Sequence, residues 1–171
     1  MNIVDKAFVF ASAAHAAIGQ KRKFSGEDYI VHPIEVASWV RSIKGDENMI
    51  AAAYLHDTVE DTDVTLKLIE NFFGEDVAEL VENLTDISKP EDGNRKVRKE
   101  IDRQHTAKAS ARAKTIKLAD LISNTRDITK QDKNFAVVYM QEKVALMEVL
   151  KEGNEELYAK AQNLIDDYYR E

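Results

Sequence analysis

Apolar residues recur at intervals of three and four positions along most of the chain, and this spacing limits the folds that the chain can adopt. One such series runs through Ile3, Ala7, Ala11, Ala14 and Ile18. The spacing is typical of amphipathic helices that bury one face in a globular core. Only two prolines and six glycines interrupt the pattern. We therefore predict an all-α protein folded as a helical bundle.

Glycine and proline positions predict where the helices begin and end. Glycine adopts the left-handed conformation in which many helices stop, and proline suits the first turn of a helix. On this basis Gly19, Gly45 and Gly74 end helices, Pro33 begins one, and Gly153 joins the last two as a C-terminal helical hairpin. The predicted helices span residues 3–18, 33–43, 49–58, 65–73, 76–86, 111–128, 135–151 and 154–169.

Length and charge narrow the classes of function. With 171 residues, 44% of them apolar, the chain can enclose one sizeable core, so we predict a single domain over residues 1–171. The net charge of −7 argues against a broad nucleic-acid or membrane-surface role, and an anionic ligand must meet a local basic cluster.

The absence of cysteine excludes disulfides, thiolate catalysis and cysteine-type zinc sites. Without a leader-like or membrane-spanning segment, the expected location is the cytoplasm. The oligomeric state is left open, with a homo-oligomer among the options.

The densest group of ionisable residues follows a small apolar run, residues 50–55. It reads His56, Asp57, Thr58, Val59, Glu60 and Asp61. On a continuous helix His56 would lie beside Glu60, and Asp57 beside Asp61. Several buried carboxylates repel one another, and a divalent cation would remove that cost.

Two further residues offer matching metal ligands. His32 stands just before Pro33, and Asp120 interrupts an apolar stretch at residues 116–122. Together with His56 and Asp57 they predict a site with two nitrogen and two oxygen ligands. This ligand set suits Mn²⁺, Fe²⁺, Co²⁺ or Zn²⁺ better than Ca²⁺, and Mn²⁺ is our first choice.

Three segments carry a resemblance to a known family. They read RKFSGEDYIVHP at residues 22–33, AAYLHDTVEDT at residues 52–62 and IKLADLISNTRDI at residues 116–128. The arrangement His…His-Asp…Asp resembles the HD phosphohydrolase superfamily. The strings are similar to the hydrolase domain of RelA/SpoT proteins and to the small alarmone hydrolases of the metazoan SpoT-homologue type. The likeness extends over residues 3–150, and Asp28 stands where that family usually has proline.

The resemblance implies an HD-domain, Mn²⁺-dependent enzyme of the stringent response. Its expected reaction is hydrolysis of the 3′-pyrophosphate of ppGpp and pppGpp, which releases pyrophosphate and leaves GDP or GTP. No synthetase-like region follows, so hydrolysis without an opposing synthesis is expected. The implied roles are metal binding by His32, His56, Asp57 and Asp120, catalysis by Glu60 and Asp61, and substrate binding by Arg22, Lys23, Ser25 and Asn124.

Other interpretations of these residues stay open. The substrate could be another nucleotide, such as pppApp, the 2′-phosphate of NADPH or a nucleoside monophosphate. The chain could also be a nucleotide sensor without catalysis, although the Glu60 and Asp61 pair argues against that. Arg22 and Lys23 could be an ordinary exposed loop. The basic residues between Arg95 and Arg103 are more often a solvated face than a site.

Overall fold

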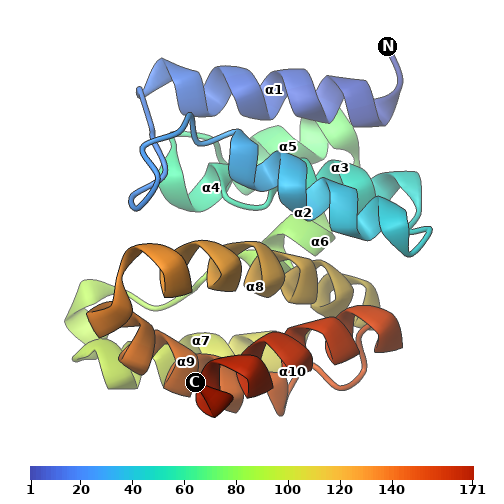
Figure 1. The fold of residues 1–171 in the computed structure, drawn as a ribbon. Coiled ribbons are helices and arrows are strands. Elements are labelled where there is room, and N and C mark those ends of the chain that lie inside the picture. The colour runs from blue at the N-terminus through green and yellow to red at the C-terminus, as the bar shows by residue number, and fades with distance from the viewer.

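The computed structural model describes residues 1–171, and its regular elements are all helices, apart from one isolated β-bridge between Lys21 and Asp28. The predicted all-α fold is confirmed. Figure 1 shows two tiers of helices, with α8 (Ala111–Gln131) lying between them. The upper tier holds α1 (Ile3–Ala17), α2 (Val31–Ser42), α3 (Glu47–Leu55), α4 (Thr58–Asp61) and α5 (Leu66–Phe73).

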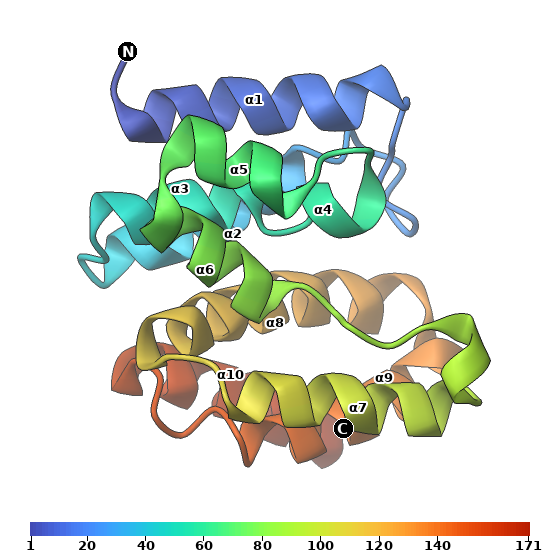
Figure 2. The same cartoon turned by 180° about the vertical axis from the view of Figure 1, so that it is seen from behind.

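The lower tier is formed by the second half of the chain. Figure 2 shows α6 (Glu75–Leu84) leading down from the upper tier to this half. The lower tier contains α7 (Arg95–Ala107), α9 (Lys133–Met147) and α10 (Glu155–Arg170), with a short 3₁₀ turn (Pro90–Asp92) ahead of α7. None of these helices has both the length and the apolar composition needed to cross a membrane.

The core is organised around two helices, α3 and α8. All residues of α3 from Met49 to Leu55 are buried, and α3 packs against α1, α2 and α6. Helix α8 is buried along most of its length and contacts α2, α6, α9 and α10. The buried apolar residues form one cluster that extends from Val4 to Ile165. Side chains that project from α3 and α8 are therefore held in a fixed, well-packed frame.

The predicted helix at residues 49–58 is wrong at its end, because α3 stops at Leu55 and a separate short helix, α4, begins at Thr58. Polar side chains form hydrogen bonds with the backbone carbonyl groups in the last turn of α3. His56 Nδ1 lies 2.7 Å from the Ala53 carbonyl oxygen, and Thr58 Oγ1 donates to the Leu55 carbonyl at 2.8 Å. Such local bonds compete with helix continuation. His56 and Asp57 therefore occupy a turn between α3 and α4, so the single continuous helix expected from the sequence does not form, although the Asp57 carbonyl accepts the Asp61 amide at 3.0 Å with helical spacing.

Arg112 ties together the beginnings of three helices. It donates to Asp46, the N-cap of α3, at 3.0 Å and to Asp76, in the first turn of α6, at 2.8 Å. The hydrogen bonds from Arg112 and Asn48 lower the pKa of Asp76 to about 2. Burial pushes the pKa of Asp46 up, but Arg112 and the Met49 amide hold it below its usual value.

We expect Arg112→Gln to lower the free energy of unfolding at neutral pH, by about 0.5–1 kcal/mol because the pairs are surface ones. Carboxyls with lowered pKa stabilise the fold above their unfolded pKa of about 4. This contribution is lost as the pH falls through about 2 for Asp76. Urea denaturation of both proteins between pH 7 and pH 2 should therefore show their difference shrinking in the acid range. A constant difference would contradict this origin of the stability.

Candidate active site

The predicted metal ligands come together although they lie far apart in the sequence. His32 Nε2 lies 3.0 Å from Asp120 Oδ1 and 3.6 Å from Asp57 Oδ2. His56 Nε2 lies 3.0 Å from Asp57 Oδ2 and 3.5 Å from Asp120 Oδ1. Ligand atoms of His32, His56 and Asp57 all lie within 4.8 Å of one another, and Asp120 joins the group through both imidazoles. Two nitrogen and two oxygen donors thus face one point.

Both imidazoles are oriented by a hydrogen bond at Nδ1. His56 Nδ1 contacts the Ala53 carbonyl oxygen, which can only accept, so Nδ1 carries a proton and Nε2 is the nitrogen that faces the two carboxylates. His32 Nδ1 lies 3.0 Å from Ser123 Oγ. A hydrogen bond at the far nitrogen is the usual way to orient a histidine that binds a metal.

The Nε2 atom of His56 is the observation that best fits a metal ligand. It is buried and makes no hydrogen bond, although two carboxylates lie nearby. Buried polar atoms are nearly always paired, so an unpaired one needs an explanation. A divalent ion held by His32, His56, Asp57 and Asp120 supplies the missing partner, and these donors suit such an ion.

The site concentrates negative charge below the protein surface. Burial raises the pKa of Asp57, but His56 holds it well below its usual value. Burial likewise opposes ionisation of Asp120, yet Lys117 and His32 keep its pKa well below normal. Burial lowers the pKa of His56, while Asp57 and Asp120 raise it well above the ordinary range. Two ionised carboxylates in so small a volume favour a cation.

Neighbouring side chains hold the two carboxylates in place. Tyr29 donates its hydroxyl to Asp57 Oδ2 at 2.6 Å, and burial and Asp57 raise the pKa of Tyr29 far above normal. Asn124 donates to Asp120 Oδ1 at 2.9 Å, and Lys117 Nζ lies 3.0 Å from Asp120 Oδ2. The sequence reasoning missed Tyr29. Its place three residues before His32, inside the first family-like segment, was the available signal.

Arg22 is buried rather than presented to solvent. Its guanidinium lies 3.3 Å from Glu35 and 3.4 Å from Asp127. Glu35 also accepts a hydrogen bond from the Ser123 hydroxyl, which in turn contacts His32. A continuous polar chain therefore runs from Arg22 to a candidate metal ligand. The direct contact of Arg22 with substrate stays a prediction, and its charge is already compensated by two carboxylates.

Glu60 and Asp61 belong to α4 and lie beside the ligand group. Glu60 Oε1 accepts from the Asp86 amide, while Asp61 Oδ2 accepts from Gln20 Nε2 at 3.0 Å. Partial burial, then Asp86 and Asp57, raise the pKa of Glu60 to about 8. Burial and Asp57 also raise the pKa of Asp61. A carboxyl that titrates near neutrality suits proton transfer.

The loop before α2 carries the other predicted substrate residues. Lys23 and Ser25 are exposed, and Ser25 Oγ contacts Glu27. Lys23 Nζ lies 5.3 Å from the ring centroid of Phe24 and 5.7 Å from that of Phe135 in α9. The loop therefore contacts the lower tier through Phe135. It also contacts the metal-ligand group, because Tyr29 at the end of the same loop donates to Asp57.

An all-helical bundle that joins two histidines and two aspartates in this way is an HD-type domain. A family described as "HD domain" matches residues 7–150, so the chain belongs to the HD-domain family. The predicted resemblance is confirmed.

Named relatives point to one branch of that family. A Synechocystis protein named "Probable guanosine-3′,5′-bis(diphosphate) 3′-pyrophosphohydrolase" is 52% identical over 87 residues, which are 51% of this chain and 11% of that protein. An Aquifex aeolicus guanosine-3′,5′-bis(diphosphate) 3′-pyrophosphohydrolase is 44% identical over 86 residues, covering 50% of this chain and 12% of the relative. The chain therefore aligns with about a tenth of the length of these relatives.

Solved structures match over far more of their length. A structure described as a metazoan ortholog of SpoT that hydrolyses ppGpp superimposes with a TM-score of 0.87 and 29% identity, covering 98% of this chain and 96% of that one. A protein from Listeria monocytogenes shares the fold with a TM-score of 0.69, at 23% identity and over 85% of this chain and 99% of its own.

Proposed function

We propose that this chain is a guanosine-3′,5′-bis(diphosphate) 3′-pyrophosphohydrolase. It hydrolyses the 3′-pyrophosphate of ppGpp and pppGpp, releasing pyrophosphate and leaving GDP or GTP. The observation that carries this proposal is the convergence of His32, His56, Asp57 and Asp120 beside the acidic pair on α4. The near full-length similarity to a structure that hydrolyses ppGpp supports the choice of substrate. A cytoplasmic location and the absence of nucleic-acid partners stay predictions.

The four convergent residues are proposed to hold Mn²⁺, as the sequence suggests. Neutral imidazoles and ionised carboxylates are ligands that Mn²⁺ shares with Fe²⁺, Co²⁺ and Zn²⁺. When bound, the ion supplies Lewis acidity, which activates water and polarises a phosphoryl oxygen. The hydrogen bonds at both Nδ1 atoms keep His32 and His56 turned toward this point.

The acidic pair is proposed to manage the protons of the reaction. Glu60, with its pKa raised to about 8, accepts a proton from the attacking water and can return it to the leaving group. Asp61 is held by Gln20, whose Oε1 lies 2.8 Å from His15 Nδ1, so its carboxylate has a fixed direction. Lys23, Ser25 and Asn124 are proposed to contact the nucleotide, and Arg22 to act mainly by positioning Glu35 and Asp127.

Product analysis tests the proposal. The Mn²⁺-loaded protein and an Asp57→Ala control are incubated with ppGpp, pppGpp, pppApp, NADPH and nucleoside monophosphates, and the products are separated by ion exchange. Conversion of ppGpp to GDP by the wild type alone supports the proposal. Cleavage of another nucleotide while ppGpp survives would refute the substrate, and tight ppGpp binding without cleavage would favour a sensor.

The polar chain behind His32 predicts a change in metal affinity. Ser123→Ala removes the contact at His32 Nδ1 and the link to Glu35. Loss of such a supporting hydrogen bond typically lowers metal affinity by about 10–100-fold. We expect this loss in a chelator-competition titration with Mn²⁺. Ser38→Ala is the matched control, because Ser38 is exposed and bonds only the Ile34 carbonyl within α2. Equal affinities in wild type and Ser123→Ala would remove Ser123 from this role.

A further inference from the structure

The connection between α6 and α7 contains a short segment, residues 86–88, that is bound from both tiers. The Asp86 amide donates to Glu60 Oε1 of α4, in the upper tier. The amides of the next two residues donate to Asp102 of α7, in the lower tier. Two carboxylates from opposite tiers therefore hold three consecutive amides of a segment that has no helical structure of its own.

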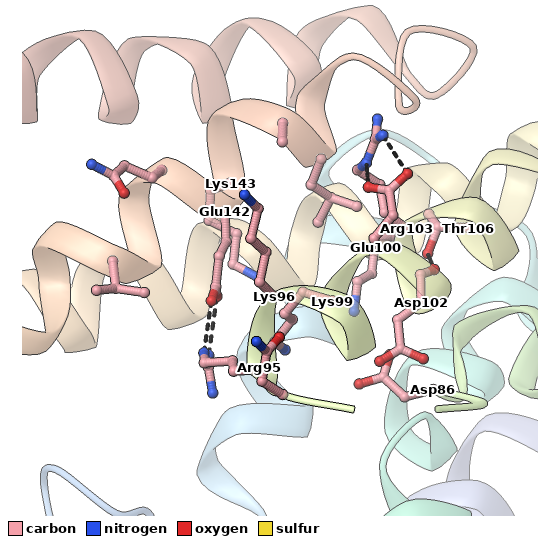
Figure 3. A pocket seen from close by; sticks show the side chains of 16 residues that line it. Asp86, Arg95, Lys96, Lys99, Glu100, Asp102, Arg103, Thr106, Glu142 and Lys143 are labelled. Atoms are coloured by element: carbon pink, nitrogen blue, oxygen red, sulfur yellow. Dashed lines mark hydrogen bonds and ion pairs between the residues drawn. The ribbon is translucent and has the colours of Figure 1, made fainter. Parts of the chain in front are cut away.

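Asp102 directs its whole carboxylate at this segment. It is only 8% exposed, and its Oδ1 accepts both amides at 2.9 Å while its Oδ2 accepts the Ser88 hydroxyl at 2.7 Å. Figure 3 shows its side chain directed from α7 toward Asp86, and both residues line a cavity of about 680 Å³ between α7 and α9. Aspartate is unfavourable inside a helix and costly to bury. The three hydrogen bonds offset that cost.

At the other end of the segment, Asp86 acts on Glu60 in two opposing ways. Its amide hydrogen bond favours the ionised form of Glu60, whereas its carboxylate disfavours that form. Partial burial, then the Asp86 carboxylate and Asp57, outweigh the amide and raise the pKa of Glu60 to about 8. A displacement of the segment would therefore change both the direction of the Glu60 carboxylate and its protonation.

Glu60 has little else to fix its direction. The helix that carries it, α4, is only four residues long, and the bond from the Asp86 amide is the one hydrogen bond that its side chain makes. A glutamate side chain has several rotatable bonds, and ordering them costs entropy. The direction of this carboxylate thus depends on a backbone amide that is itself held from α7.

We propose that Asp102 is a positioning residue for Glu60. By holding the backbone of residues 86–88, it presents the Asp86 amide to the Glu60 carboxylate. Asp102 acts through this segment and not on the substrate. The kinetic consequence rests on the proposed function, in which Glu60 transfers protons, and it gives a lower-tier helix a part in the chemistry of the upper tier.

The kinetic test removes the support without touching Glu60. Asp102→Ala should lower kcat for ppGpp by about 10- to 100-fold, the cost of a small misplacement, while KM and Mn²⁺ affinity stay near wild type. Asp102→Asn should restore most of kcat, because its amide oxygen can still accept both backbone bonds. In a Glu60→Gln background, Asp102→Ala should add little further loss. Losses that multiply would overturn the inference.

A second pair of variants tests the middle of the chain and does not depend on how Asp102→Ala folds. Asp86→Pro removes the amide hydrogen and the carboxylate, whereas Asp86→Ala removes the carboxylate alone. The preceding residue, Thr85, has the extended conformation that proline requires before it, with φ −87° and ψ 126°. We expect kcat to be at least about tenfold lower in Asp86→Pro than in Asp86→Ala. Equal values would contradict a role for this amide.

Hydrogen exchange of backbone amides, followed by NMR, separates this inference from the proposed activity because it needs no substrate. In Asp102→Ala, the Asp86 amide should exchange at least about tenfold faster, together with the two amides that lose their acceptor. Asp92→Ala is the matched control, since Asp92 accepts only the Lys89 amide further along the same connection.

The outcomes are distinct. An Asp86 amide that stays protected in Asp102→Ala, or that is exposed equally in Asp92→Ala, would overturn the inference even if ppGpp is cleaved. Faster exchange confined to Asp102→Ala, in a protein that cleaves no nucleotide, would support the placement of Glu60 by Asp102 while the proposed function falls.

Discussion

Replacing Asp57 with alanine is expected to abolish both metal binding and hydrolysis. Its Oδ2 atom lies 3.0 Å from His56 Nε2 and 3.6 Å from His32 Nε2, at the centre of the ligand group. Without Asp57, Asp120 is the only carboxylate in the ligand group that can balance the charge of a divalent cation. Since loss of a supporting residue alone costs about 10–100-fold in affinity, loss of a ligand should exceed ~100-fold. Metal content after dialysis and rates of ppGpp cleavage should both fall below detection.

The matched control for this change is Asp63→Ala. Asp63 is an exposed aspartate a few residues further along the chain, outside the ligand group. It should keep wild-type metal content and activity. Thermal unfolding followed by circular dichroism would confirm that both variants fold. Retention of stoichiometric metal by Asp57→Ala would show that the ion is held elsewhere.

Replacing Glu60 with glutamine is expected to lower kcat by about 10²–10⁴-fold while the bound metal is retained. Glutamine keeps the shape and can still accept a hydrogen bond from the Asp86 amide, but it cannot take a proton. Because the pKa of Glu60 is raised to about 8, its basic form accumulates as the pH rises toward that value. The wild-type rate should increase over this range, and the variant's residual rate should be flatter.

Glu70→Gln on the surface of α5 is a suitable control, since Glu70 pairs only with Lys67. It should show the wild-type rate and pH profile. The comparison between Asp57→Ala and Glu60→Gln then separates metal binding from proton transfer. Loss of metal in both variants to the same degree would refute that division of roles.

The sequence pattern was sufficient for the fold class, and it singled out the four residues that the fold brings together. A single sequence contains the local apolar periodicity that predicts helices, and it also shows ionisable residues at 56, 57 and 120 ending or interrupting apolar runs. That these residues bind a metal stays a prediction. The end of α3 was predicted too late, because bonds from His56 and Thr58 to preceding carbonyls decide it. Periodicity does not report such side-chain bonds.

The apolar pattern of the sequence does not predict contacts between distant segments. Tyr29 and Asp57 are separated by 28 positions, and Ser123 and Glu35 by 88. Arg22 was predicted to contact the substrate from a basic loop, with an ordinary exposed loop as the alternative, yet its guanidinium is buried between two carboxylates. Likewise the basic segment at residues 95–103 was expected to be a solvated face. The fold instead places part of this segment in the wall of a cavity that it shares with α9, where Lys143 lies.

The two-tier arrangement has a consequence for how the two halves of the chain can be varied. The candidate ligands come from the upper tier and from α8, whereas the cavity is walled largely by α7 and α9 of the lower tier. Substitutions in the cavity wall on α7 and α9 therefore leave the four candidate ligands themselves unchanged, so the two halves of the chain can be altered separately by mutagenesis.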